Sequence, residues 1–177
     1  MIPLFIFPMI KAEREQARLR AASTSEVASD DGKSRLGVPG NWVQIPQLNA
    51  KATLHLGHKE EERYVIVLTD PKADFSGMTL AKHHQTTRES MLKKMTNSSA
   101  TEPVSLTING LPALQDELRG TQGQADVVFL HTTVEGDQNF YQILTWTLQS
   151  RWPEASEQLH KVAASFRVGD QGRPASQ

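Results

Sequence analysis

Residues 103–118 read PVSLTINGLPALQDEL, and this stretch sets the pattern for the rest of the chain. Its apolar residues Val104, Leu106 and Ile108 alternate with polar ones, and a period of two predicts a half-buried β-strand. The Asn-Gly pair at 109–110 follows, and both residue types tolerate positive φ. The stretch therefore predicts a β-hairpin.

The second strand of this hairpin, two further strands and a helix are expected next. Residues 113–118, 125–134 and 139–149 are rich in apolar, β-branched and aromatic residues, and the connections between them are short. Short connections require antiparallel neighbours, because a parallel pair needs a long crossover. Residues 153–166 then place apolar residues at helical spacing, with Pro153 suited to the first position of a helix.

The preceding part of the chain adds further strands and a second helix. A short strand is predicted at 42–45, a hairpin from 52–56 and 63–69, and a helix over 78–97. Together these elements predict an α+β fold: a central, mostly antiparallel sheet of about six to seven strands, covered by two main helices.

Both ends of the chain differ in composition from this domain, which we expect to span residues 38–168. Residues 1–20 are apolar and then charged, and the apolar run is about half the roughly 20 residues that a membrane-spanning helix needs. This segment is either the remnant of a membrane anchor that begins upstream or an apolar tail that docks locally; we favour the first. Residues 21–37 lack periodicity and predict a flexible linker, and residues 169–177 predict a disordered tail.

Composition excludes several functions. The net charge is -1, and no cluster of Lys and Arg supplies the basic surface that nucleic-acid binding requires, so no nucleic-acid partner is expected. The absence of cysteine excludes disulfides, thiolate catalysis and cysteine-ligated zinc. No phosphate-binding or nucleophile-elbow motif is present, and no cofactor is predicted.

Histidines and carboxylates are the candidates for a metal site or for acid–base chemistry. His55 and His58 lie near the acidic run 60–62, but residues three apart on a strand point to opposite faces, so no metal site is predicted there. Asp116 and Glu117 also diverge on a strand, and we expect them to be exposed charges and not an acid–base pair.

Aromatic residues provide candidates for partner recognition. Trp42, Tyr141 and Trp152 are candidate interface anchors, although such residues pack in a core more often than they bind a partner.

Three short motifs carry a resemblance to a known family. GLPALQDE at 110–117, FYQI at 140–143 followed by Trp146, and SFR at 165–167 resemble the PsbP-like superfamily, whose fold is shared by the photosystem II extrinsic protein PsbP and the yeast Ran-binding nuclear import factor. Uncharacterised bacterial members are the nearest in pattern. The resemblance implies a PsbP-like sandwich over 38–168 that binds a protein partner or assists assembly, and it favours the cell envelope.

Two functional hypotheses follow. The first is a non-catalytic protein-binding or assembly module, tethered to a membrane by its N-terminal segment. The alternative is a small-ligand-binding protein or an enzyme that uses a pocket between sheet and helix, centred on His83, His84 and His131. The basic residues after the apolar run favour a cytoplasmic domain, whereas the resemblance favours the envelope.

Overall fold

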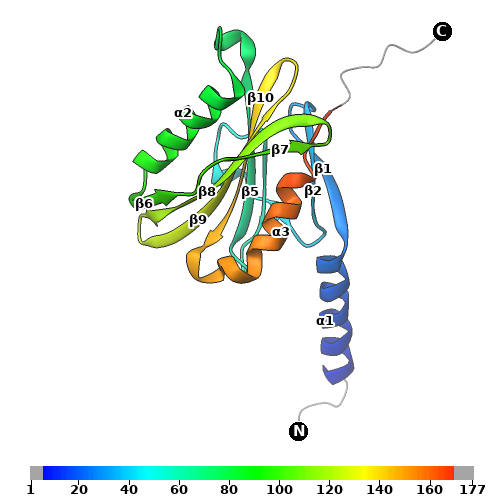
Figure 1. Ribbon diagram of the computed structural model, residues 1–177. Coiled ribbons are helices and arrows are strands. Elements are labelled where there is room, and N and C mark those ends of the chain that lie inside the picture. The colour runs from blue at the N-terminus through cyan, green and yellow to red at the C-terminus, as the bar shows by residue number, and fades with distance from the viewer. Residues whose placement is uncertain (1–5, 170–177) are drawn as a thin grey trace, which may run out of the picture.

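The computed structural model describes the backbone of residues 6–169 and the side chains of residues 10–169 (Figure 1). Its helices are α1 (Ile6–Ala22), α2 (Leu80–Lys93) and α3 (Trp152–Ala164), with short 3-10 turns at Pro46–Leu48, Lys72–Asp74 and Gln149–Arg151. Its strands are β1 (Thr24–Ala28), β2 (Ser34–Pro39), β3 (Val43–Gln44), β4 (Leu54–His58), β5 (Arg63–Pro71), β6 (Thr96–Ala100), β7 (Val104–Ile108), β8 (Leu111–Gln122), β9 (Ala125–Glu135), β10 (Asn139–Leu148) and β11 (Arg167–Val168).

The main sheet has eight strands in the order β3-β4-β5-β10-β9-β8-β6, with β7 paired to β8 beside β6. Every strand pair among the described residues is antiparallel. The predicted α+β class and antiparallel sheet are therefore confirmed. The sheet is wider than expected because residues 96–100, TNSSA, pair with β8 although they have no apolar alternation.

The two helices predicted from the sequence cover opposite faces of this sheet. Alternation along β9 shows the division: Val128 and Leu130 belong to the core under α3, whereas Phe129 and His131 face α2. The α3 face is the larger core. It also includes Phe166, which is fully buried just after α3 ends.

The segment 21–37 differs from the expected linker. It contains β1 and most of β2, which form a three-stranded sheet with β11. Leu36 and Val38 are buried in the α3 core, and the Gly37 N–H donates to Ser165 Oγ at 2.8 Å. The strands escaped prediction because only two apolar positions in β2 alternate and β1 is mostly exposed.

The Asn-Gly turn between β7 and β8 is confirmed. Asn109 has φ 46° and Gly110 has φ 86°, the positive values that a tight hairpin requires. Asn109 Nδ2 also donates to the Phe166 carbonyl at 2.7 Å, so this turn fixes the hairpin to the C-terminal end of α3.

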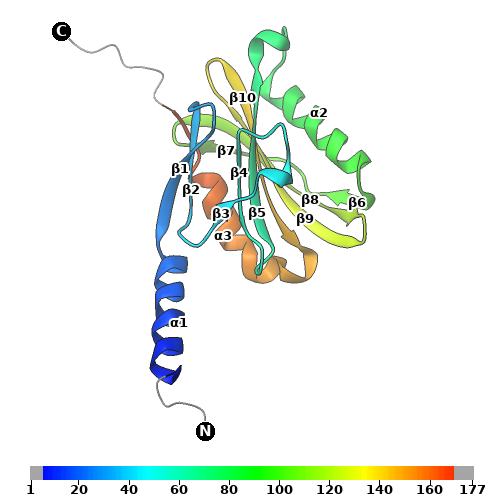
Figure 2. The ribbon, with the colours of Figure 1, turned by 180° about the vertical axis from the view of Figure 1, so that it is seen from behind.

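Helix α1 projects from the domain in both views (Figures 1 and 2), and its described side chains are exposed. Among residues 6–169, no helix is long and apolar enough to cross a membrane. Of the predicted tail, Gly169 is buried and its N–H donates to the Lys33 carbonyl at 2.7 Å. Residues 170–177 lie outside the described residues, as do residues 1–5 of the predicted N-terminal segment.

Candidate functional site

A row of three aromatic rings crosses the α2 face of the sheet. Tyr64 of β5 lies opposite Trp146 of β10, which lies opposite Phe129 of β9. The Tyr64 and Trp146 rings stack with centroids 5.3 Å apart, and those of Trp146 and Phe129 are 5.4 Å apart. Tyr64 and Trp146 are only half-buried, so this aromatic row presents apolar surface to solvent.

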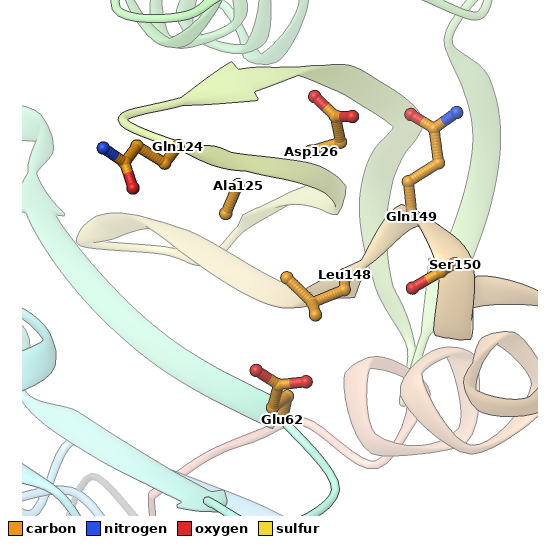
Figure 3. A pocket seen from close by; sticks show the side chains of 7 residues that line it. All are labelled: Glu62, Gln124, Ala125, Asp126, Leu148, Gln149 and Ser150. Carbon is orange, nitrogen blue, oxygen red and sulfur yellow. The ribbon is translucent and has the colours of Figure 1, made fainter.

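A pocket of about 640 Å³ lies at the end of the sheet near this row (Figure 3). Two of its lining residues, Ala125 and Leu148, belong to the same apolar cluster as Trp146 and Phe129. Its lining residues are Glu62, Gln124, Ala125, Asp126, Leu148, Gln149 and Ser150. Figure 3 shows Ala125, Leu148 and Glu62 on one side of the ends of β9 and β10, whereas Asp126 and Gln149 point to the other side. The lining contains two carboxylates and no basic residue, so we call it the acidic pocket.

The two carboxylates of the acidic pocket are accessible to solvent, and each has one side-chain partner near the surface. Glu62 pairs with the exposed Arg151 at 3.1 Å, and Asp126 accepts a hydrogen bond from Thr121 Oγ1 at 2.7 Å. Burial and the negative charge of Glu62 raise the pKa of the Tyr64 hydroxyl. A partner cation could replace Arg151 at Glu62 at small cost, because exposed ion pairs contribute little.

A second group of polar residues is buried between α2 and the sheet. His84 of α2, Asp116 of β8 and His131 of β9 are 1%, 2% and 0% exposed. Asp116 Oδ1 lies 2.9 Å from His131 Nδ1 and 3.2 Å from His84 Nε2, and the two imidazole rings stack at 4.2 Å. On the other carboxylate oxygen, Arg88 Nε donates to Asp116 Oδ2 at 2.6 Å.

This buried group shifts the pKa of its members. Burial raises the pKa of the Asp116 carboxyl, but the hydrogen bond from His131 and the adjacent His84 imidazole outweigh burial and hold that pKa well below 3.8. Burial, aided by His84, lowers the pKa of His131 despite the carboxylate. Asp116 is thus an anion balanced by Arg88, and His131 is neutral at pH 7.

His83, the residue before His84, belongs to a separate contact. His83 Nε2 lies 3.0 Å from Asp70 Oδ2, to which Gln142 Nε2 donates at 2.6 Å, and the His83 ring stacks on Phe140 at 4.5 Å. Burial raises the pKa of Asp70, but the hydrogen bonds from His83 and Gln142 leave it below 3.8.

No protein-family model matches the chain, and no curated protein matches it. Solved structures do match. The cyanobacterial PsbP (CyanoP) of Synechocystis superposes with a TM-score of 0.63 and 14% identity, covering 83% of this chain and 93% of that one. The chain has a PsbP/Mog1-like fold.

Two more solved structures share the PsbP/Mog1-like fold with this chain. LpqN of Mycobacterium tuberculosis matches with a TM-score of 0.60 and 13% identity, covering 83% of this chain and 91% of that one. The Ran-binding protein Mog1p of Saccharomyces cerevisiae matches with a TM-score of 0.53 and 13% identity, over 82% and 95% of the two chains. The resemblance expected from the sequence is confirmed for the fold.

The PsbP/Mog1-like fold buries all three aromatic residues considered as interface anchors. Trp42, Tyr141 and Trp152 lie in the α3 core with exposures of 7%, 1% and 7%, so none is available to a partner in this conformation. Tyr141 packs against Phe166 with ring centroids 5.0 Å apart. Tyr64 and Trp146, which do reach the surface, were not among these candidates, although Trp146 belongs to the motif that carries the resemblance.

The structure also shows where the candidate histidines and Asp116 lie. His84 and His131 come together as the alternative hypothesis requires, but they are buried, and four surface pockets formed by described residues contain no histidine in their linings. His55 and His58 form no group of metal-ligand geometry among the described residues. The expectation that Asp116 is an exposed charge is wrong, because its side of β8 faces α2.

Proposed function

We propose that this chain is a non-catalytic protein-binding module that recognises a partner through the aromatic row and the acidic pocket. The observation that carries the proposal is that the two lie close together. The half-buried Trp146 shares an apolar cluster with Ala125 and Leu148, which line an opening with two carboxylates and no basic residue. The partner segment that fits carries an apolar side chain next to a Lys or Arg, because aromatic faces and carboxylates both attract cations.

Burial of the reactive groups supports a binding role over catalysis. His84, Asp116 and His131 are the described residues most suited to acid–base chemistry, yet they are buried and contact one another. A substrate would need a cavity that reaches them. One structural relative agrees with a binding role, since Mog1p is a Ran-binding protein.

The membrane tether is a further part of this proposal. The exposed α1 projects from the domain, and none of its residues 10–22, whose side chains the structure describes, belongs to either core, as expected of a tethering segment. The structural relative LpqN is described as involved in cell envelope biogenesis, which supports an envelope location. Fractionation of native cells should recover the chain with membranes, and a variant lacking residues 1–22 should shift to the soluble fraction. Recovery of both chains in the soluble fraction would exclude the tether.

Site-specific photo-cross-linking tests the binding face. We expect a photoreactive residue at Gln124, which lines the acidic pocket, to trap one partner at near-stoichiometric yield in native extracts. The same residue at Gln47, also exposed but in the turn after β3, should trap none above background. With the purified partner, Glu62→Lys should weaken binding about 10-fold or more, because it reverses a charge at the contact.

Matched substitutions distinguish this face from a general charge effect. Glu102→Lys makes the same charge change at an exposed residue between β6 and β7 and should leave the affinity unchanged. Equal yields at Gln124 and Gln47, or a partner whose affinity Glu62→Lys does not alter, would refute the proposed face.

A further inference from the structure

Three ligand-type atoms converge between α2, β8 and β9. His84, Asp116 and His131 each offer one ligand atom, and these three atoms all lie within 4.8 Å of one another. Two ligands held about 2.0–2.1 Å from a tetrahedral zinc ion are about 3.3 Å apart. The observed separations of 2.9 Å and 3.2 Å between Asp116 Oδ1 and the two ring nitrogens are close to that value.

One of these atoms is an orphan. His84 Nε2 is fully buried and has no hydrogen-bond partner, because its 3.2 Å approach to Asp116 Oδ1 lacks hydrogen-bond geometry. An unpaired buried nitrogen costs free energy, and a bound cation would satisfy it.

The opposite nitrogen of each ring is fixed by a threonine hydroxyl. His84 Nδ1 lies 2.8 Å from Thr133 Oγ1, and His131 Nε2 lies 2.9 Å from Thr87 Oγ1. Histidines that bind metals are oriented in this way by a partner on the second nitrogen. Arg88 holds Asp116 Oδ2 in turn, which leaves Oδ1 directed at the two rings.

Without an ion, His131 Nδ1 donates to Asp116 Oδ1 at 2.9 Å. When an ion binds, the His131 proton would move to Nε2, which leaves both ligating nitrogens bare. The Thr87 hydroxyl can donate to the helix backbone, because its Oγ1 lies 3.1 Å and 3.0 Å from the carbonyl oxygens of His83 and His84. The same oxygen can accept a hydrogen bond from the Nε2–H of His131. His84 can likewise donate from Nδ1 to Thr133 Oγ1. In this arrangement Nε2 of His84 and Nδ1 of His131 each carry a lone pair that can bind the ion.

We propose that His84, Asp116 and His131 bind one Zn²⁺ ion, with a water molecule as the fourth ligand. Two imidazoles and one carboxylate are a donor set that zinc accepts. Because the ligands come from α2, β8 and β9, the ion would cross-link the helix to the sheet. This site is independent of the proposed binding face, which contains none of these residues.

Zinc titration of the full chain, stripped with chelator and then dialysed, tests the site. We expect one equivalent of Zn²⁺ to bind, and the melting temperature to rise by roughly 5–10 °C at a free Zn²⁺ concentration about 100 times Kd. Long-range proton–nitrogen NMR should show ring-nitrogen shifts at two of the six histidines, His84 and His131. This measurement uses the unaltered protein, so it does not depend on a variant that folds.

Variants assign the ligands. His84→Gln and His131→Gln should each weaken Zn²⁺ binding by about 100-fold or more, since loss even of an outer partner costs 10–100-fold. His83→Gln is the matched control, because His83 is equally buried on the same helix but contacts Asp70. It should change the affinity by less than about 3-fold.

Two results would overturn the proposal. Absence of a melting shift and of stoichiometric zinc would mean that the three residues form a hydrogen-bonded network only. Zinc binding that shifts the ring nitrogens of His55 and His58, or that survives both ligand variants, would place the ion elsewhere.

Discussion

Replacing Asp116 by Asn should lower the free energy of unfolding by about 3 kcal/mol at pH 7, measured by urea denaturation in the presence of chelator. The carboxylate is buried, and it faces Arg88 Nε at 2.6 Å, His131 Nδ1 at 2.9 Å and His84 Nε2 at 3.2 Å. An amide removes the charge that balances Arg88. In either orientation it also presents its N–H₂ to a donor, Arg88 Nε on one side or, in the metal-free protein, His131 Nδ1 on the other. Breaking a buried pair by removing one partner costs about 3–5 kcal/mol, and the partial exposure of Arg88 favours the lower end.

The neighbouring carboxylate provides the control. Glu117 points to the other side of β8 and pairs with Arg119 at 2.8 Å near the surface, where ion pairs contribute little. Glu117→Gln should therefore cost less than about 1 kcal/mol. A loss below about 1 kcal/mol for Asp116→Asn, or equal losses for the two variants, would show that the buried network does not stabilise the fold.

The pH dependence follows from the lowered pKa of Asp116. A carboxyl with a depressed folded-state pKa contributes stability above its unfolded pKa, near 3.8, and that contribution disappears as the pH falls toward the folded value. The stability difference between the wild type and Asp116→Asn should be constant near neutral pH and shrink below about pH 4.

Asp116 shows why the sequence predicts the fold better than the site. Its i±2 neighbours Leu114 and Leu118 mark one face of β8, and a carboxylate between two leucines on that face was a signal of burial. Its partner, however, depends on the strand register, which places Asp116 directly opposite His131. The register in turn depends on the turn at Gln122–Ala125. The sequence also does not show which face of the sheet α2 covers.

The same reasoning applies to the aromatic row. Tyr64 and Trp146 are far apart in sequence, and only the pairing of β5 with β10 makes them neighbours. The strands themselves were predictable because alternation and β-branched residues are local properties. β6 was not, since its residues TNSSA are held by backbone pairing to β8 and not by an apolar face.

Truncating Phe166 to Ala should lower the free energy of unfolding by about 3–5 kcal/mol, which is the second large effect that the structure predicts. The ring is fully buried where α3 ends, and it packs against Tyr141 at 5.0 Å. Removing the ring forfeits its burial and leaves a cavity that cannot collapse freely, because the Phe166 carbonyl is held by Asn109 Nδ2 and the adjacent Ser165 is hydrogen-bonded to Gly37. Equilibrium urea unfolding gives the loss directly if the denaturant slope is unchanged.

Phe75→Ala makes the same truncation at a ring that is 36% exposed in the loop before α2, and it should cost less than about 1 kcal/mol. Phe166→Leu keeps most of the apolar volume and should lie between the two. Since Phe166 is on the α3 face and the aromatic row is on the α2 face, molecules of Phe166→Leu that remain folded should bind the partner with unchanged affinity. A loss for Phe166→Ala no larger than that for Phe75→Ala would contradict the view that α3 and its closing residues hold the sandwich together.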